Sequence, residues 1–199
     1  MKLLFRIVLL LIINHLSSII LFPVSAQQEF TVNYDTTYIV EEDGTANVTQ
    51  GITLSNNFSE TYAASYDLIL EGPSPLEIQA VENETDLPIQ IKKENEQTII
   101  SVTFPKAIVG KGKIRLFSIK YKLAEVAVKN GQVWEVTIPK IITPETINSK
   151  VLTLYVPKNF GLAAYISPEP KHKDSTDTLH IFTFEKEDLL KAGVVAAFG

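Results

Sequence analysis

The 199-residue sequence contains no cysteine. Disulfide bonds, zinc-thiolate sites, a thiol nucleophile and the lipid-modified cysteine of bacterial membrane anchors are therefore excluded from this chain. Small animal ectodomains usually depend on disulfides, so an exported protein without any fits a bacterial or archaeal cell surface better.

Other signatures of catalysis are also missing. The chain has three histidines, and it contains neither a G-x-S-x-G serine motif nor a glycine-rich phosphate loop. His172 and His180, with Asp174 and Asp177 between them, lack the spacing of a metal-binding motif and are better explained by a polar loop. We predict no catalytic, cofactor-binding or metal-binding residues here.

The chain has no excess of basic charge. It carries 18 lysines and arginines against 23 acidic residues, a formal net charge of −5. Loss of residues 1–26 removes Lys2 and Arg6 and no acidic residue, which leaves 16 basic against 23 acidic residues and a charge of −7. This acidity argues against nucleic acid and anionic lipid as partners and leaves proteins or other envelope components.

Residues 1–26 have the pattern of a secretory signal peptide. A basic start precedes an apolar run from Ile7 to Phe22, and Val24 and Ala26 are small residues suited to a cleavage site. We predict cleavage between Ala26 and Gln27. The alternative is an uncleaved anchor, but 16 helical residues span only about 24 Å of a hydrocarbon core of roughly 30 Å. Membrane contact is expected only through this leader or through a segment after Gly199.

The mature chain begins with a clear alternation of apolar and polar residues. Apolar side chains at alternate positions from Phe30 to Val40, and again from Ala46 to Leu54, predict two half-buried strands. Between them, Glu41-Glu42-Asp43-Gly44 has the composition of a tight turn, which is a better explanation than a calcium loop. Together these segments predict a long antiparallel hairpin.

Further short strands follow at intervals that suit a sandwich. They are expected at 62–70, 76–81, 89–93, 97–104, 114–121 and 132–139. The apolar positions change parity after Leu116, which predicts a β-bulge there. Trp134 is expected to anchor the core. The tyrosines at 34, 38, 62 and 66 share the parity of apolar neighbours, so a core position is favoured over a sugar-stacking platform.

A change in composition near residues 140–149 predicts a domain boundary. We expect a first domain over 27–142, an antiparallel β-sandwich, and a second, incomplete β domain over 143–199. The second has strands at 150–156, 162–166 and 179–184 and a helix at 186–191. Because the apolar run 194–198 would form an unpaired edge, we expect that the native protein continues beyond Gly199.

Three stretches of the sequence resemble a known family. "FTVNYDTTYIVEEDGTANVTQGITLSNNFSETYAASYDLIL", "NGQVWEVTIPKI" and "VPKNFGLAAYISPEP" are similar to the N-terminal, non-catalytic region of exported transglutaminase-like proteins from uncultured bacteria. The hairpin more distantly resembles the lumenal region of ribophorin-type oligosaccharyltransferase subunits. The first resemblance implies two β-sandwich modules before a papain-like domain with a Cys-His-Asp triad. No residue of that triad can be placed on this chain, which has no cysteine.

These observations predict an exported, non-catalytic β module that acts as a structural or interaction region at the cell envelope, as the N-terminal part of a larger transglutaminase-like protein. One alternative is the leader portion of a cysteine transamidase or protease whose catalytic domain lies further along. Another is a carbohydrate-binding module that uses exposed tyrosines.

Overall fold

The structure is a computed structural model that describes residues 28–140 and 146–199. The predicted signal peptide, the cleavage site at Ala26 and Gln27 and the predicted boundary after residue 142 lie outside these residues. Strands make up 63% of the described chain and helices 4%, so the predicted all-β class is confirmed. Within the described ranges, no helix has the length and apolar character needed to cross a membrane.

The described chain forms fifteen strands, one short α-helix and one 3-10 turn. They are β1 (Phe30–Val40), β2 (Ala46–Asn56), β3 (Ser65–Glu71), β4 (Leu76–Glu82), β5 (Thr85–Leu87), β6 (Ile89–Glu94), β7 (Gln97–Thr103), β8 (Ile114–Leu123), β9 (Ala127–Asn130), β10 (Val133–Ile138), β11 (Thr146–Pro157), η1 (Lys158–Phe160), β12 (Ala163–Ser167), β13 (His172–Ser175), β14 (Leu179–Glu185), α2 (Lys186–Leu189) and β15 (Val194–Phe198). The predicted helix thus begins at Lys186 but ends two residues early.

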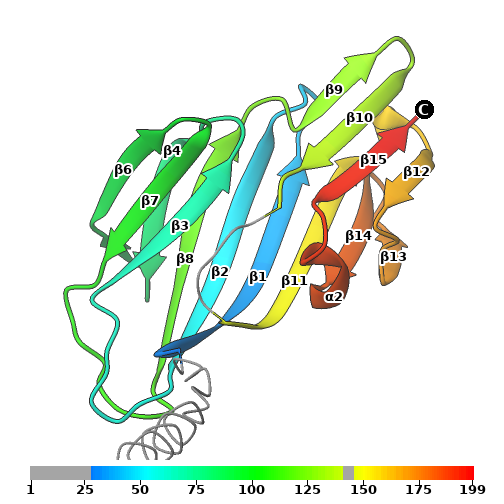
Figure 1. The fold of residues 1–199 in the computed structure, drawn as a ribbon. Coiled ribbons are helices and arrows are strands. Elements are labelled where there is room, and N and C mark those ends of the chain that lie inside the picture. The colour runs from blue at the N-terminus through cyan, green and yellow to red at the C-terminus, as the bar shows by residue number, and fades with distance from the viewer. Residues whose placement is uncertain (1–27, 141–145) are drawn as a thin grey trace, which may run out of the picture.

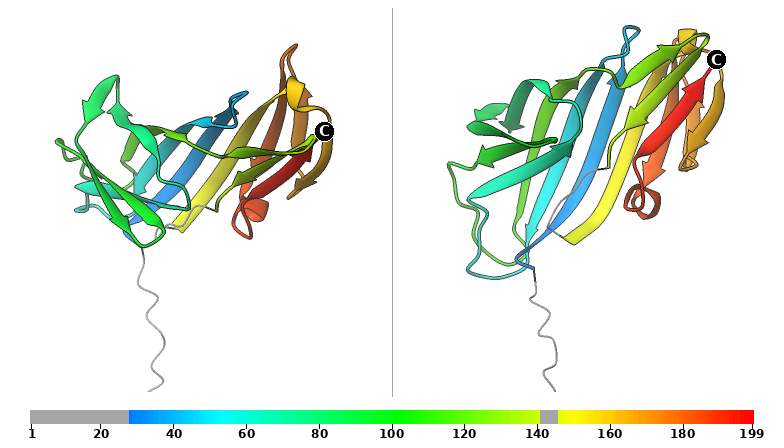
Figure 2. Two further views of the ribbon diagram at one scale, coloured as in Figure 1. Left: turned by 90° about the horizontal axis from the view of Figure 1, so that it is seen from above. Right: turned by 45° about the horizontal axis from the view of Figure 1, so that its top comes forward.

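The strands form one large sheet and two small ones (Figure 1). The large sheet has the order β13-β14-β11-β1-β2-β8-β4-β5, and the small sheets have the orders β12-β15-β10-β9 and β3-β7-β6. Both small sheets lie on the same side of the large sheet, over its two halves (Figure 2). The layers therefore form a sandwich in which one outer layer is divided in two.

The predicted hairpin is confirmed. β1 and β2 pair antiparallel from Phe30 opposite Asn56 to Val40 opposite Ala46, without a shift of register. Alternate residues of both strands are buried, as in Val32 and Ile52, because only one face of the large sheet is covered by the small sheets. The alternation read from the sequence therefore corresponds to the two faces of one sheet.

The predicted boundary after residue 142 does not separate two sets of sheets. β11, which follows it, pairs parallel with β1, with Tyr34 beside Lys150. β15 pairs antiparallel with β10, which precedes the boundary. The later strands therefore extend both the large sheet and one small sheet that the earlier strands begin.

Two local predictions are wrong. The terminal strand β15 is not an unpaired edge, because β10 and β12 pair with it on either side. The bulge near Leu116 is also absent: β8 pairs with β2 in regular register from Ile114 to Leu123. Ile114 and Leu116 change parity because they project from the uncovered face, where they are 53% and 63% exposed.

One continuous apolar core fills the space between the layers. Under the three-stranded sheet, the Phe117 ring meets the edges of Tyr66 and Phe104 at centroid distances of 5.4 and 5.0 Å. Under the four-stranded sheet, Phe182 and Phe198 pack at 5.9 Å. Aromatic side chains thus fasten each small sheet to the large one.

Candidate functional site

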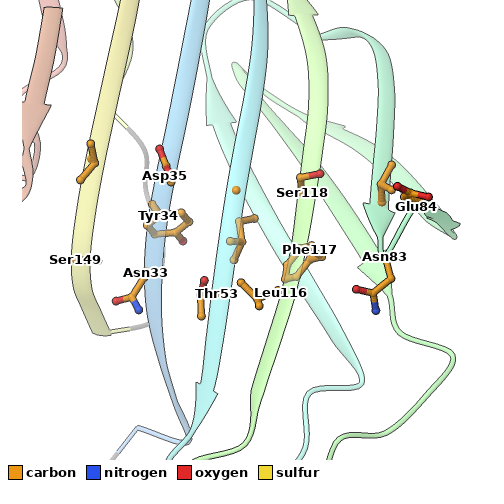
Figure 3. A pocket seen from close by; sticks show the side chains of 14 residues that line it. Asn33, Tyr34, Asp35, Thr53, Asn83, Glu84, Leu116, Phe117, Ser118 and Ser149 are labelled. Carbon is orange, nitrogen blue, oxygen red and sulfur yellow. The ribbon is translucent and has the colours of Figure 1, made fainter.

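The face of the large sheet that carries neither small sheet is the candidate site, and we call it the open face (Figure 3). It is built by the residues that alternate with the core positions on the central strands. On β1, for example, Tyr34 is buried, whereas Asn33 and Asp35 project to the other side. The same alternation on β2, β8 and β11 places polar side chains in rows across the sheet.

A shallow hollow of about 650 Å³ lies on this face over β1, β2 and β8. One row across it consists of Asp35, Gly51 and Ser118, which are direct neighbours in register. The next row consists of Asn33, Thr53 and Leu116. Ser149 and Val151 of β11 border one end, and the turn between β4 and β5, with Asn83 and Glu84, borders the other (Figure 3).

Gly51 gives the hollow its depth. It has no side chain on a strand whose outward neighbours all have one, so the sheet backbone is reached directly between Asp35 and Ser118. A Cβ atom at position 51 would lie 3.1 Å from the backbone oxygen of Asp35, which is a tight contact. A glycine inside a strand commonly marks such a close backbone approach.

The lining is rich in groups that can form hydrogen bonds. It offers hydroxyls from Thr53, Ser118 and Ser149, and carboxylates from Asp35 and Glu84. Neither carboxylate has an ion-pair partner within residues 28–140 and 146–199. Leu116 adds an exposed apolar surface beside these polar groups. This arrangement can hold a polar surface or ligand.

The acidic turn predicted at Glu41 to Gly44 is confirmed as a turn. The backbone N–H of Gly44 donates to the carbonyl of Glu41 at 3.0 Å, and Asp43 accepts from the backbone N–H and hydroxyl of Thr45 at 2.9 and 2.7 Å. The hydroxyl and backbone hydrogen bonds from Thr45 lower the pKa of the Asp43 carboxyl. Its carboxylate is thus occupied within the turn itself.

The structure brings the two loop histidines onto neighbouring strands but gives them different surroundings. His172 is exposed on β13, whereas His180 of β14 is half-buried and its Nε2 lies 3.0 Å from the carbonyl oxygen of Gly161. Asp174 accepts a hydrogen bond from the backbone N–H of Ser175. Within the described ranges, no three His, Asp or Glu residues gather where they could hold a metal ion.

The favoured core position is confirmed for three of the four predicted tyrosines. Tyr34, Tyr38 and Tyr66 are 1–3% exposed, whereas Tyr62 is 48% exposed. The four therefore do not form a sugar-stacking platform. Trp134 is half-buried rather than fully enclosed, and it stacks on Phe160 with ring centroids 4.0 Å apart.

Sequence reasoning missed the open face. The open face is made of the polar residues that alternate with the apolar core residues on the same strands. The hairpin pairs the residues of β1 and β2, but β8 and β11 join this face only through the strand order, which no local pattern predicts. Gly51 is the one local signal, because a glycine in the middle of an alternating strand is unusual.

The comparisons with known proteins concern the fold. No family model matches this chain, and no curated protein matches it in sequence. Its fold is similar to the solved structure of an M1 zinc metallopeptidase from Deinococcus radiodurans, at a TM-score of 0.51 and 13% identity, over 85% of this chain and 42% of that one.

Two further solved structures are similar at a TM-score of 0.50. One is a two-domain M1 zinc metallopeptidase mutant bound to L-tryptophan, with 13% identity over 85% of this chain and 43% of that one. The other is Legionella pneumophila aminopeptidase A in complex with aspartic acid, with 12% identity over 85% of this chain and 21% of that one. This chain spans less than half the length of these proteins, and the likeness shows the fold alone.

Proposed function

We propose that this chain is an exported, non-catalytic β module that forms the N-terminal part of a larger, transglutaminase-like protein at the cell envelope and presents its open face to another domain or envelope protein. The observation that carries the proposal is the open face itself. Eight strands form it, yet it has no covering layer in the described structure. The leader-like start of the sequence supports export.

The composition of the open face suits a contact surface. Hydroxyl, amide and carboxylate groups alternate with exposed apolar residues such as Leu116 and Ile114. Non-obligate protein interfaces have this mixed character, with apolar patches among hydrogen-bonding groups. In the solved structures of similar fold, the matched region is less than half of the chain, so this fold does occur within longer proteins.

Export is tested by fusing alkaline phosphatase after Gly199, because this enzyme reporter becomes active only outside the cytoplasm. We expect activity from the fusion and loss of activity when Leu10→Arg and Leu11→Arg interrupt the apolar run of the leader. A Leu76→Arg fusion is the control, because Leu76 is 54% exposed on β4 and outside the leader. Equal activity in all three fusions would contradict export by this leader.

The contact surface is tested by photo-crosslinking in the source cells. A photoreactive residue replaces Thr53, in the hollow, or Lys93, which is exposed on β6 of the three-stranded sheet. We expect position 53 to crosslink reproducibly to one defined site in the rest of the protein or in one envelope protein, and position 93 not to do so. Crosslinks from position 93 alone would move the contact surface away from the open face.

A carbohydrate-binding module is the second candidate, now favoured by the hollow rather than by tyrosines. The hydroxyl, amide and carboxylate groups of the hollow match the hydrogen-bonding needs of a sugar. The two aromatic residues in its lining, Tyr34 and Phe117, are buried on the core side of the sheet, so neither offers a ring on which a sugar could stack. Titration with cellotetraose and chitotetraose, followed by NMR, tests it. The second candidate is supported if sugar shifts the NMR signals of the unmodified chain and of Asp67→Ala, on β3, but not those of Asp35→Ala. If millimolar sugar shifts no signal, both ligands are excluded.

A further inference from the structure

The packed face of the large sheet, opposite the open face, contains a small group of polar side chains. Thr36 and Gln50 are 0% exposed, and Tyr121 is 3% exposed. The Thr36 hydroxyl, both polar atoms of the Gln50 amide and the Tyr121 hydroxyl are buried without a hydrogen-bond partner in the described chain. Unpaired buried polar groups are rare in folded proteins, and each calls for a physical explanation.

Strand register places these groups side by side. Thr36 of β1 lies directly opposite Gln50 of β2, and Gln50 lies opposite Ile119 of β8. Tyr121 is two residues beyond Ile119 and so projects from the same face. We call Thr36, Gln50 and Tyr121 the polar strip. It crosses three adjacent strands at the centre of the large sheet.

The members of the strip cannot satisfy one another completely. The Gln50 amide has two N–H donors and an oxygen acceptor, whereas each hydroxyl supplies one donor. A direct bond between Thr36 and Gln50 would leave amide groups and the Tyr121 hydroxyl unpaired. The Tyr38 hydroxyl lies close enough to the Tyr121 hydroxyl to act on its pKa, but the Gln50 amide and the Thr36 hydroxyl remain without a partner in the described chain.

We propose that the polar strip is a binding site for ordered internal water that bridges Gln50 to Thr36 and Tyr121. The ligand must be small and must both donate and accept hydrogen bonds, because the strip offers both kinds of group in a closed interior. It must also be neutral, because none of the three side chains carries a charge at neutral pH. Water with two to four polar partners meets these conditions.

Direct detection uses NMR on the whole chain. Contacts between protons of long-lived water and the Gln50 side-chain amide protons are expected in the unmodified protein. They should disappear in Gln50→Met, which keeps the length of the side chain and removes its polar atoms. If the Gln50 amide protons show contacts to Thr36 or Tyr121 and none to water, the site is closed by direct side-chain pairing and the proposal is overturned.

Thermal unfolding is a second test, because the change in Tm on substitution has opposite signs for a polar strip that holds water and for one that does not. With bridging water, Thr36→Val and Gln50→Met should each lower Tm by about 2–4 °C, because each substitution leaves the other groups that bind the water without a complete set of hydrogen bonds. The double variant should lose less than the sum of the two. In a dry strip, both changes remove an unpaired polar group and should raise Tm instead, which would also overturn the proposal.

The matched control is Thr49→Val on the same strand. Thr49 is adjacent to Gln50 but exposed on the open face, so this change should leave Tm and the water contacts of Gln50 unaltered.

Discussion

The two faces of the eight-stranded sheet are made by the same strands, yet they differ in almost every physical property. On the packed face, Val32, Ile52 and Ile119 are 0–1% exposed beneath the two small sheets. On the open face, the alternate positions carry hydroxyls, amides and carboxylates, with Leu116 63% exposed among them. The difference teaches that alternation assigns each residue to a face, and that the covering layers decide which face becomes core.

The largest test of this comparison removes one aromatic side chain from the packed face. Phe184 is 1% exposed on β14, opposite Leu152 of β11. Phe184→Ala should lower the free energy of unfolding by about 3–5 kcal/mol, because it loses buried surface and leaves a cavity. Urea unfolding measures the change.

The control for Phe184→Ala is Leu116→Ala on the open face. An exposed side chain away from any packed layer should change the free energy of unfolding by no more than about 0.5 kcal/mol. A loss at Leu116 as large as the loss at Phe184 would mean that the open face is covered in the protein as studied.

A second test concerns the turns at opposite ends of the sheet. Gly44 has φ +85°, and a Cβ there would lie 2.1 Å from the carbonyl oxygen of Ala127, whereas Gly112 has φ +73° and nothing within 4 Å. Gly44→Ala should lower the free energy of unfolding by about 2–4 kcal/mol and Gly112→Ala by only about 1 kcal/mol. Both carry the backbone penalty, so the difference in urea unfolding isolates packing of the β1–β2 turn against β9. Equal losses would contradict that packing.

A third test concerns a lysine that is buried on the packed face. Lys150 is 3% exposed on the packed face of β11, and burial together with repulsion from Lys140 lowers its pKa to about 8. Below pH 8 the folded state holds a desolvated ammonium. Lys150→Met should therefore raise the free energy of unfolding at pH 7 by about 1–3 kcal/mol.

The pH dependence of this third test has a defined sign. Between pH 8 and the ordinary lysine pKa of 10.5, the unfolded chain binds more protons at position 150 than the folded chain, so the unmodified protein gains stability as pH rises. The advantage of Lys150→Met should shrink over that range. Lys120→Met, on the exposed side of β8, is the control and should show no such trend. An advantage that stays constant to pH 10 would show that Lys150 is not destabilised by its charge.

The strands were predictable from the sequence because alternation is a local signal. The hairpin β1–β2 and the buried side of β3, β7 and β10 follow from apolar residues at every second position. Ile114 and Leu116 were misread for the same reason: the rule that apolar residues face inward required a bulge, whereas both residues simply project from the open face.

The pairing of distant strands was not predictable from local pattern. β11 lies beside β1 although more than a hundred residues separate Tyr34 from Lys150, and no local sequence feature states that choice. The same kind of non-local pairing gives β15 its two neighbours, β10 and β12, and places Ser118 of β8 beside Gly51 of the β1–β2 hairpin. The polar strip escaped notice because Thr36 and Gln50 are single polar residues in otherwise apolar positions.

The position of β1 inside the large sheet has a mechanical consequence. β1 begins at the lower end of the sheet and β15 finishes near the upper end (Figure 1). β1 is hydrogen-bonded along its length to β2 on one side and to β11 on the other. Tension applied between Phe30 and Phe198 would therefore pull along the strands and strain many backbone bonds together instead of opening them one at a time. A domain pulled in this direction should resist extension.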